Sequence, residues 1–374
     1  MTMAAAKKVL IVCDKNPCTS FGRLASDVSV SLQMAGYFTK ILWLAVPRYF
    51  PQGVPKEDEA IYAKNLYSGF YTFRKPLKKV LYRENPDIVF WIRPEIGFLV
   101  PVARKALPKT RMVVMVHDTF AETLYPKSLK FRLFKMLFAD PAKGADHYVY
   151  VSEYTKSAAE QYYGKPRVSS AVIGNPIRNN LFFFKDRGTS DQRSLFWKEH
   201  GVSGFRGVCL NVSLDEPRKN LKTFFEVARL NPDVAFVRVG RLRPSTLKML
   251  DSLDLKNVFH FYEIPDELLV DFYRNADLML YPSFVEGFGL PPIEAIACGT
   301  PAVAAETSGL AENLKGVVPL LNDPEDAEGF SQILRCVLSG EKIVDEAAAQ
   351  KMLERCSLEA FSKRLSDFMN TVVG

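Results

Sequence analysis

Short apolar runs alternate along the chain with longer stretches in which apolar residues recur at helical spacing. The apolar runs of the first half are KKVLIVC, TKILWLAV, DIVFWI, RMVVMVHD, YVYVS and SSAVIG, and those of the second half are GVCLNVS, VAFVRVG, NVFHFYEI, DLMLYP and PAVAA. Runs of this kind, separated by helices, are typical of strands in a parallel sheet that is covered on both faces. The pattern therefore predicts an α/β chain with one parallel sheet in each half.

The segments between the strands predict helices and one longer connector. Ser152 stands where its side chain can cap the helix that follows it. A turn is expected at Asn175-Pro176, and residues 176–206 are expected to form an irregular, polar connector. Residues 357–373 have apolar side chains at helical spacing and predict a terminal helix.

Length and composition indicate a folded chain of more than one domain. At 374 residues the chain is too long for one ordinary core, so we expect two domains, residues 1–180 and residues 181–354. No apolar run is long enough to span a membrane. The six cysteines and four histidines are scattered, which predicts neither a disulfide framework nor a metal site and fits a cytoplasmic location.

The net charge of +7 is distributed unevenly. Residues 1–183 hold 27 Lys and Arg and 14 Asp and Glu, a balance of +13, whereas residues 184–374 hold 22 and 28, a balance of −6. A basic half indicates that one domain meets something anionic, although charge alone is equally consistent with simple solvation.

The stretch SFVEGFGLPPIEAIACGTPAVA, residues 283–304, places two glutamates around a glycine-rich bend. Gly287 and Gly289 let the backbone approach a ligand, and the paired prolines fit a helix start. Free N–H groups there form an anion site beyond the carboxyl ends of parallel strands. Glu294, expected in the first turn of the helix, can accept hydrogen bonds from both hydroxyls of a ribose. Glu286, one loop earlier, is expected near the group that is attached to the phosphates. Alone, Glu294 could merely favour the helix N-terminus.

A basic pair stands in the stretch LDEPRKNLKTFFEVA, residues 214–228, between a predicted strand and a predicted helix. Arg218 and Lys219 could neutralise a diphosphate leaving group as a glycosidic bond breaks. Taken alone, a solvated turn with surface cations is the simpler interpretation of this pair.

Together these stretches resemble the retaining glycosyltransferases of the GT-B fold, most closely family 4 (group 1). The resemblance covers YPSFVEGFGLPPIEAIACGTPAVA over its whole length, and also EPRKN, IPDELLVDFYRNADLMLYPS, VSEYTKSAAEQYYG and VIGNPI. It extends over most of the chain from about residue 113 onward and is weaker before. It implies two Rossmann-like α/β domains that face each other across a cleft, an acceptor-side domain first and a nucleotide-sugar domain second. Residues 355–374 would form a helix that packs back on the first domain.

The resemblance assigns donor binding to the second domain. Glu294 would bind the ribose, and Glu286 would contact the donor sugar. Arg218 and Lys219 would hold the diphosphate, and these two residues with Glu286 are expected to be catalytic. The remaining donor-binding positions would act through the backbone or a loop, with the last two at the nucleobase: Gly287, Phe288, Gly289, Leu290, Ser213, Tyr262 and Ile264.

In the first domain the resemblance singles out two residues. VHD is similar to the strand-end histidine motif of the family, so His117 would reach toward the sugar as a catalytic residue, although a lone histidine there is more often structural. Gly22 matches a glycine loop that approaches donor phosphate or acceptor. The chain also departs from the pattern: Ser213 and Tyr262 stand where glycine is usual, and an arginine that some members carry near Ser213 is missing.

The implied reaction moves a sugar from a nucleoside diphosphate, UDP or GDP, to an acceptor hydroxyl with retention of anomeric configuration. The leaving phosphate would help to take the acceptor proton, so that no enzymic nucleophile is needed. No cofactor is expected. No metal is expected either, because Arg218, Lys219 and the helix N-terminus would replace it.

Two basic segments with interspersed apolar residues, 72–83 and 125–140, bear on the acceptor. A basic amphipathic helix can lie on an anionic membrane surface, which predicts peripheral contact at the inner face of the membrane and a glycan or lipid-linked acceptor. The alternative is that the apolar face packs in the core. No nucleic-acid-binding module accompanies the charge, so nucleic acid is not an expected partner.

Other functions remain open on the same fold. A nucleotide-sugar epimerase would release an altered sugar without an acceptor, and a glycogen-type phosphorylase would need a pyridoxal-phosphate lysine and a much longer chain. A non-catalytic partner that binds a glycan or another subunit is the third alternative. The candidate catalytic and ribose-binding residues are intact, which argues against a loss of catalysis: Glu286, Glu294, Arg218, Lys219 and His117. Ser213 and Tyr262 leave that alternative open. Turnover of a donor would distinguish these functions.

Overall fold

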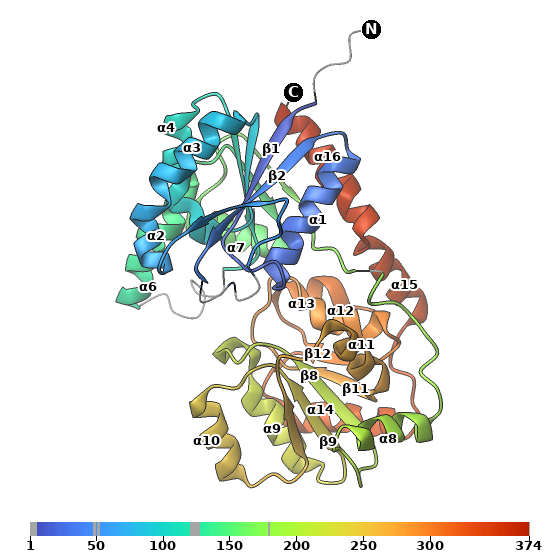
Figure 1. Ribbon diagram of the computed structural model, residues 1–374. Helices are drawn as coiled ribbons and strands as arrows, with labels where there is room; N and C mark the ends of the chain where they lie inside the picture. The colour runs from blue at the N-terminus through green and yellow to red at the C-terminus, as the bar shows by residue number, and fades with distance from the viewer. Residues whose placement is uncertain (1–5, 48–49, 51–52, 120–127, 179, 374) are drawn as a thin grey trace. The chain divides into compact units, whose positions relative to one another are not determined.

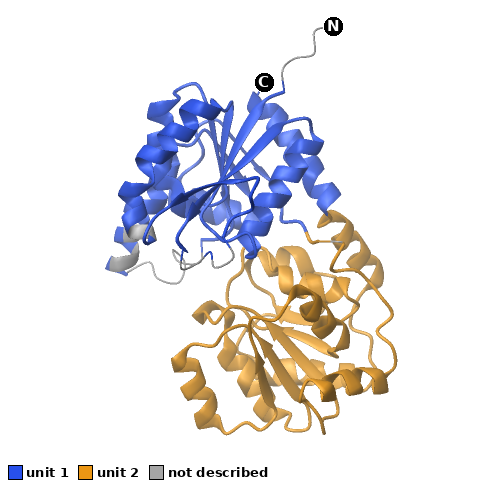
Figure 2. Cartoon of the chain, viewed as in Figure 1, with its two compact units in different colours: residues 1–176, 358–374 blue, residues 177–357 orange. Residues whose placement is uncertain are grey.

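A computed structural model describes residues 6–47, 50, 53–119, 128–178 and 180–373. The chain forms two compact units, residues 1–176 with 358–374 and residues 177–357 (Figure 2). These divisions lie a few residues from the expected ones at 180 and 354. Ile177 N donates to Cys356 O at 2.8 Å, so that the residues at both ends of the second unit are held together.

The first unit contains a seven-stranded sheet in the order β3-β2-β1-β4-β5-β6-β7, in which every neighbouring pair is parallel (Figure 1). Its strands are β1 Lys8–Cys13, β2 Phe38–Ala45, β3 Glu59–Tyr62, β4 Ile88–Trp91, β5 Arg111–Val116, β6 His147–Tyr150 and β7 Ser169–Val172. The winding direction reverses between β1 and β4. Open α/β sheets bind ligands at such a switch point, beyond the carboxyl ends of the strands.

Helices cover both faces of this sheet (Figure 1). They are α1 Ser20–Met34, α2 Leu66–Thr72, α3 Arg74–Glu84, α4 Val100–Ala106, α6 Leu129–Phe134, α7 Glu153–Tyr163 and α16 Leu358–Val373. Leu10 and Val12 of β1 share a core cluster with Leu77 of α3, while the alternate residues Val9 and Ile11 are buried as well. Both faces of the strand are therefore apolar, as expected for a parallel sheet.

Helix α16 packs against α1, far away in the sequence, so the end of the chain belongs to the first unit. Ser362 Oγ donates to Ser31 Oγ at 2.7 Å, and Arg364 Nε donates to Ile173 O at 2.8 Å. The predicted cap of α7 is confirmed, because the Ser152 side chain accepts from Thr155 N at 3.0 Å.

The second unit contains a six-stranded parallel sheet in the order β10-β9-β8-β11-β12-β13. Its strands are β8 Val208–Val212, β9 Ala235–Val239, β10 Val258–Phe261, β11 Leu278–Tyr281, β12 Ala302–Ala305 and β13 Leu320–Leu321. Its helices are α8 Ser190–Glu199, α9 Leu221–Leu230, α10 Pro244–Leu253, α11 Asp266–Asn275, α12 Leu290–Ala297, α13 Ser308–Leu314, α14 Ala327–Leu338 and α15 Glu346–Arg355. Here the switch point lies between β8 and β11.

The expectation of an irregular connector over residues 176–206 was wrong, because it contains the helix α8. A capping box starts this helix: the Thr189 side chain accepts from Gln192 N, and Thr189 N donates to the Gln192 side chain. Trp197 is its buried residue, so the segment lacks the apolar stripe that reveals a helix in sequence.

The basic segment 125–140 forms less regular helix than predicted. Helix α6 continues into a π-helical turn, Lys135–Ala139, and then into a 3-10 turn, Asp140–Gly144. Residues 120–127, Lys127 among them, lie outside the described residues. Within the described parts of the chain, no helix combines the length and apolar character needed to cross a bilayer.

Candidate active site

Two loops meet at the switch point of the second unit. One follows β8 and includes a 3-10 turn, Pro217–Lys219, and the other follows β11 and leads into α12. Phe284 N donates to Arg218 O at 2.8 Å, and Asn220 Nδ2 donates to Pro282 O at 3.1 Å. These contacts fix the two loops against each other, so the side chains that they carry have defined positions.

The carboxylate of Glu286 joins both cations of the other loop. Lys219 Nζ lies 2.5 Å from Glu286 Oε1, and Arg218 Nη1 lies 2.8 Å from Glu286 Oε2. Arg218 also donates through Nε to Glu216 at 2.7 Å, and Lys219 donates to the hydroxyl of Tyr281 at 3.0 Å. Arg218, Lys219 and Glu286 are all buried, with at most 8% of each exposed.

Burial and neighbouring charges shift the pKa values of Glu286 and Lys219 in opposite directions. Burial would raise the pKa of Glu286, but Lys219 and Arg218 outweigh it and hold that pKa below its ordinary value. Burial lowers the pKa of Lys219, and Glu286 only partly opposes this. The carboxylate is therefore ionised at neutral pH, and the two cations are already paired before any ligand is considered.

The second glutamate, Glu294, lies on α12 and accepts a hydrogen bond of 2.9 Å from the hydroxyl of Tyr273 on α11. Helix α12 begins at Leu290, so Glu294 is in its second turn and the expectation of a first-turn carboxylate was wrong. Gly289 occupies the N-cap position, so the helix starts at Leu290, one residue before the first proline. Tyr273 therefore orients the carboxylate, and the helix N-terminus contributes less to it than predicted.

The glycine-rich bend serves the fold of this loop. Gly289 has φ +87°, a left-handed conformation that L side chains avoid, and a Cβ there would come within 2.4 Å of Leu310. Asn313 Nδ2 donates to Phe288 O at 2.8 Å, and Glu286 N donates to Ser308 Oγ at 2.7 Å. Both ends of α13, Ser308 and Asn313, thus hold the bend in place.

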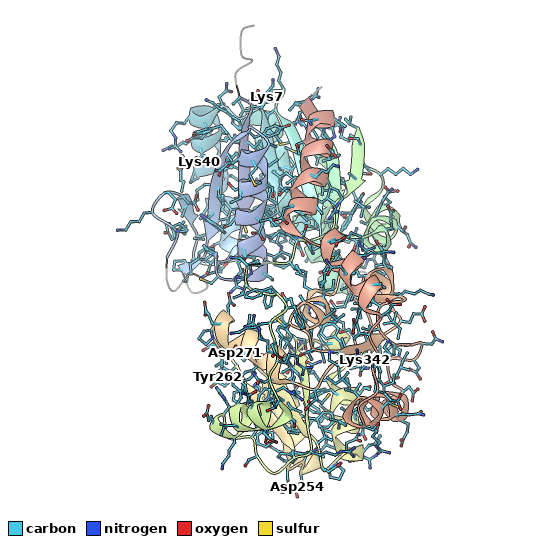
Figure 3. The ribbon with its side chains drawn as sticks, turned by 90° about the vertical axis from the view of Figure 1, so that its right-hand side faces the viewer. Lys7, Lys40, Asp254, Tyr262, Asp271 and Lys342 are labelled. Carbon is cyan, nitrogen blue, oxygen red and sulfur yellow. The ribbon has the colours of Figure 1, made fainter. Side chains whose placement is uncertain are left out.

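The remaining predicted donor positions lie beyond the ends of two strands of the same sheet. Ser213, just after β8, donates from Oγ to Asn211 Oδ1 at 3.0 Å. Tyr262 follows β10 and is 52% exposed (labelled in Figure 3); it stacks on His260, with ring centroids 5.4 Å apart. Ile264, two residues further on, is half-buried. These residues therefore follow strands β8 and β10, which β9 separates in the same sheet.

In the first unit His117 follows β5 and is buried. Its Nε2 lies 2.7 Å from Ile92 O, which can only accept, so we assign the proton of the neutral ring to Nε2. Burial lowers the pKa of His117 to about 4, against the opposing effects of the Ile92 carbonyl and Glu95. The ring is therefore neutral near pH 7, and its Nδ1 can accept but not donate a hydrogen bond.

A charged cluster not predicted from the sequence surrounds this histidine at the switch point of the first unit. Arg93, after β4, lies 2.9 Å from Glu95 and 3.7 Å from Asp14, which follows β1. The Phe21 ring lies edge-on to His117 at 4.8 Å, with the Arg93 guanidinium over its face. Burial lowers the pKa of Arg93, but the two carboxylates outweigh it and raise that pKa.

Gly22 is enclosed beside Phe21. A Cβ at this position would come within 2.0 Å of Asn16 O, so the start of α1 can lie against the loop after β1 only with glycine here. The structure thus brings Gly22 and His117 to one end of the first sheet.

Two family models match the two halves of the chain. The model for glycosyl transferases group 1 matches residues 197–355, and the model for glycosyltransferase family 4 matches residues 22–180. The chain belongs to the group 1 and family 4 glycosyltransferases. Its two parallel-sheet units have the architecture of the GT-B fold.

Individual relatives can be aligned with only part of this chain. O-antigen chain mannosyltransferase B of Escherichia coli is 32% identical over 136 residues, which are 34% of this chain and 35% of that protein. D-inositol 3-phosphate glycosyltransferase of Geodermatophilus obscurus is 40% identical over 180 residues, 44% of this chain and 40% of that protein. The aligned segments thus span less than half the length of these two relatives.

A similarity of fold extends over the whole chain. The structure of Anabaena HepE in complex with UDP-glucose matches with a TM-score of 0.76 at 18% identity, and the match covers 97% of this chain and 99% of that one. At this identity the match shows the fold of the glycosyltransferase and leaves its ligands open.

Sequence reasoning missed three groups at the two switch points: Tyr273 beside Glu294, Tyr281 beside Lys219, and the cluster around Arg93. The charged residues directly after β1 and β4 were a usable signal, because such positions meet at one edge of a parallel sheet. The two tyrosines resemble ordinary core residues in sequence and gave none. Among the described residues, no group of three or more His, Cys, Asp or Glu could hold a metal ion.

Proposed function

We propose that this glycosyltransferase moves a sugar from a nucleoside diphosphate, UDP or GDP, to an acceptor hydroxyl with retention of anomeric configuration. The observation that carries the proposal is the convergence of Arg218 and Lys219, both buried, on one carboxylate at a sheet switch point. Two fixed cations at such a place match a diphosphate. The complex of HepE with UDP-glucose supports a nucleotide-sugar as the donor class.

In this mechanism the bond between the anomeric carbon and the diphosphate oxygen breaks while the acceptor oxygen attacks from the same face. The acceptor proton passes to the departing diphosphate, and no enzymic nucleophile takes part. Arg218, Lys219 and the helix N-terminus take the place of a metal in neutralising the leaving group. Negative charge grows on the leaving oxygen, and Arg218 and Lys219 stabilise it more in the transition state than in the bound donor. Glu286 keeps both cations in position and contacts the sugar from the same point.

Other residues orient the donor. Glu294, held by Tyr273, accepts the ribose hydroxyls, and the backbone from Tyr262 to Ile264 meets the base. The bend from Gly287 to Leu290 offers its amides to sugar and phosphate. In the first unit, neutral His117 accepts a hydrogen bond from a sugar hydroxyl through Nδ1.

A thermal-shift screen with UDP, GDP, ADP and their common sugar conjugates tests the proposal. A nucleotide that binds only the folded state stabilises it by about 2.7 kcal/mol at roughly a hundred times its Kd. We expect one base to raise Tm, and Glu294→Ala to lose most of that shift, because the ribose hydroxyls lose their acceptor. Glu199→Ala, an exposed residue of α8, is the control and should keep the shift. No shift with any nucleotide at millimolar concentration would favour the non-catalytic partner.

For the acceptor we propose a glycan or lipid-linked molecule, met at an anionic membrane surface by the first unit. Helix α6 and the turn after it expose apolar side chains: Leu129, Leu133, Met136 and Leu137. Beside them a hollow of about 450 Å³ is lined by Arg74, Lys78 and Lys105 together with Met136 and Leu137. Apolar side chains ringed by cations fit the headgroup region of an anionic bilayer.

Vesicle sedimentation tests this surface. At low salt the protein should pellet with phosphatidylglycerol vesicles and stay in solution with phosphatidylcholine vesicles, because the attraction depends on charge. Leu133→Glu should abolish binding, whereas Leu247→Glu, at an exposed leucine of α10 in the second unit, should not. Equal binding to both vesicles, or to neither, would contradict the proposal.

A further inference from the structure

The second unit contains a fully buried arginine at the carboxyl edge of its sheet. Arg238 lies on β9, paired in register with Asn211 of β8, and is 0% exposed. Its Nη2 donates to Ser213 O at 2.5 Å. Its Nε and Nη1 have no hydrogen-bond partner among the described residues, and no described carboxylate lies within ion-pair distance of the guanidinium.

A buried guanidinium without a counter-ion is costly for a folded protein. Burial lowers the pKa of Arg238 to about 10, and attraction by Asp215 opposes this, so the group is positive at neutral pH. The carboxylate of Asp215 contacts something else, because it accepts from Arg243 N at 2.6 Å. The guanidinium of Arg238 therefore carries a positive charge that no described carboxylate neutralises by direct contact.

The position of this charge links it to the candidate diphosphate site. Ser213, whose carbonyl Arg238 holds, begins the loop that carries Arg218 and Lys219. The guanidinium also lies against Gly240, where a Cβ would come within 2.2 Å of Ser213 O and within 2.7 Å of Arg238 Nη1. The charge is therefore enclosed directly next to the base of the loop.

The cations of the loop itself are already neutralised. Arg218 pairs with Glu216 and Glu286, and Lys219 pairs with Glu286. Arg238 differs from both, because it adds positive charge at the same edge of the sheet without a paired carboxylate. Charges in a low-dielectric interior act over several ångströms without contact.

We propose that Arg238 is a positioning residue for the donor diphosphate, which serves as its counter-ion. The inference rests on the proposed function. Since Arg238 has no exposed surface, it does not touch the ligand: its charge raises the electrostatic potential at the diphosphate, and its bond to Ser213 O fixes the loop that bears the other two cations.

Calorimetric titration of Arg238→Gln and Arg238→Lys tests this inference with UDP, UMP and uridine, and with GDP, GMP and guanosine. We expect Arg238→Gln to weaken binding of the diphosphate about tenfold, the scale of one charge acting through the protein. The monophosphate should lose less and the nucleoside nothing. Arg238→Lys keeps the charge and should restore most of the affinity. Arg229→Gln, at an exposed arginine of α9, is the control and should bind as the unaltered protein does.

A purely structural role predicts a different result. If Arg238 only held the loop, Arg238→Gln would still weaken the diphosphate most, because the loop carries Arg218 and Lys219, but lysine would be no better than glutamine. The Tm of the unliganded Arg238→Met variant gives a second measurement, since removing an uncompensated buried charge should not lower it. If that variant does not fold, the ratio of lysine to glutamine affinities still decides.

Nucleotide binding by the unaltered protein and the role of Arg238 can be tested separately. If the unaltered protein binds no nucleoside diphosphate, the proposed function and the inference both fall. If it binds UDP or GDP and Arg238→Gln binds it equally well, the inference alone is overturned. Selective loss of the diphosphate, restored by lysine, would establish it.

Discussion

Replacing Glu286 by glutamine is expected to lower the free energy of unfolding of the second unit by about 3–5 kcal/mol, the cost of removing one partner from a buried ion pair. The variant removes the carboxylate that pairs with buried Lys219 and one of the two carboxylates that pair with Arg218. For a unit of this size the corresponding fall in Tm is on the order of 10 °C. Calorimetry, in which the transition of this unit is followed, measures it.

The pH dependence of the effect follows from the direction of the pKa shift. The folded-state pKa of Glu286 lies below its ordinary value of 4.5. Its ion pairs therefore contribute their full stability above pH 4.5 and lose it as the pH falls through the lower folded pKa. The difference in Tm between the unaltered protein and Glu286→Gln should shrink accordingly in acid.

A matched control distinguishes this effect from the loss of any carboxylate. Glu306 pairs with exposed Lys315 at 2.7 Å, and Glu306→Gln should cost less than about 1 kcal/mol, as surface ion pairs do. If Glu286→Gln were no more destabilised than Glu306→Gln, the buried ion pairs would not stabilise the unit. Inorganic pyrophosphate should stabilise Glu286→Gln more than the unaltered protein, because it can neutralise the stranded cations.

The fold could be predicted from sequence because buried parallel strands are continuous apolar runs. Each predicted run overlaps an observed strand. Two strands were missed for the opposite reason: β3 is partly exposed with a glutamate at its start, and β13 has two residues. Helix α8 was missed because its start depends on a capping box rather than on an apolar stripe.

The candidate site was predictable only where its residues lie close together in sequence. The stretch from Glu286 to Glu294 and the pair Arg218 and Lys219 are local patterns with recognisable chemistry. Glu286 contacts both cations because two loops that follow different strands meet in the fold. No local sequence pattern specifies that meeting.

Arg238 was not predictable at all. In sequence it interrupts an apolar run, VAFVRVG, and nothing nearby indicates a partner. Its contact with Ser213 O follows from the parallel register of β8 and β9, which places residues about 25 positions apart side by side. The sequence has no arginine directly beside Ser213, whereas the fold brings Arg238 to the carbonyl of Ser213 from the neighbouring strand.

Replacing Lys219 by methionine is expected to lower kcat about 10²–10³-fold while nucleotide binding weakens much less. The negative charge on the diphosphate grows as the sugar departs, so a cation fixed at this point stabilises the transition state more than the bound donor. The measurement is the release of nucleoside diphosphate from the donor that the thermal-shift screen identifies, together with the Kd of that nucleotide. Lys222→Met, at an exposed lysine of α9 three residues further on, is the control.

The two variants of the ion pair should behave differently, because they leave different charges behind. In Lys219→Met the carboxylate of Glu286 keeps its bond of 2.8 Å to Arg218, so the fold survives and the loss falls on turnover. In Glu286→Gln a buried cation is left without its carboxylate, so the variant mainly loses stability.

Tyr281→Phe removes only the hydroxyl that accepts from Lys219 Nζ at 3.0 Å and should reduce kcat less than Lys219→Met. Full turnover by Lys219→Met would show that this lysine does not face the leaving group, and the assignment of the diphosphate to this edge of the sheet would then be wrong.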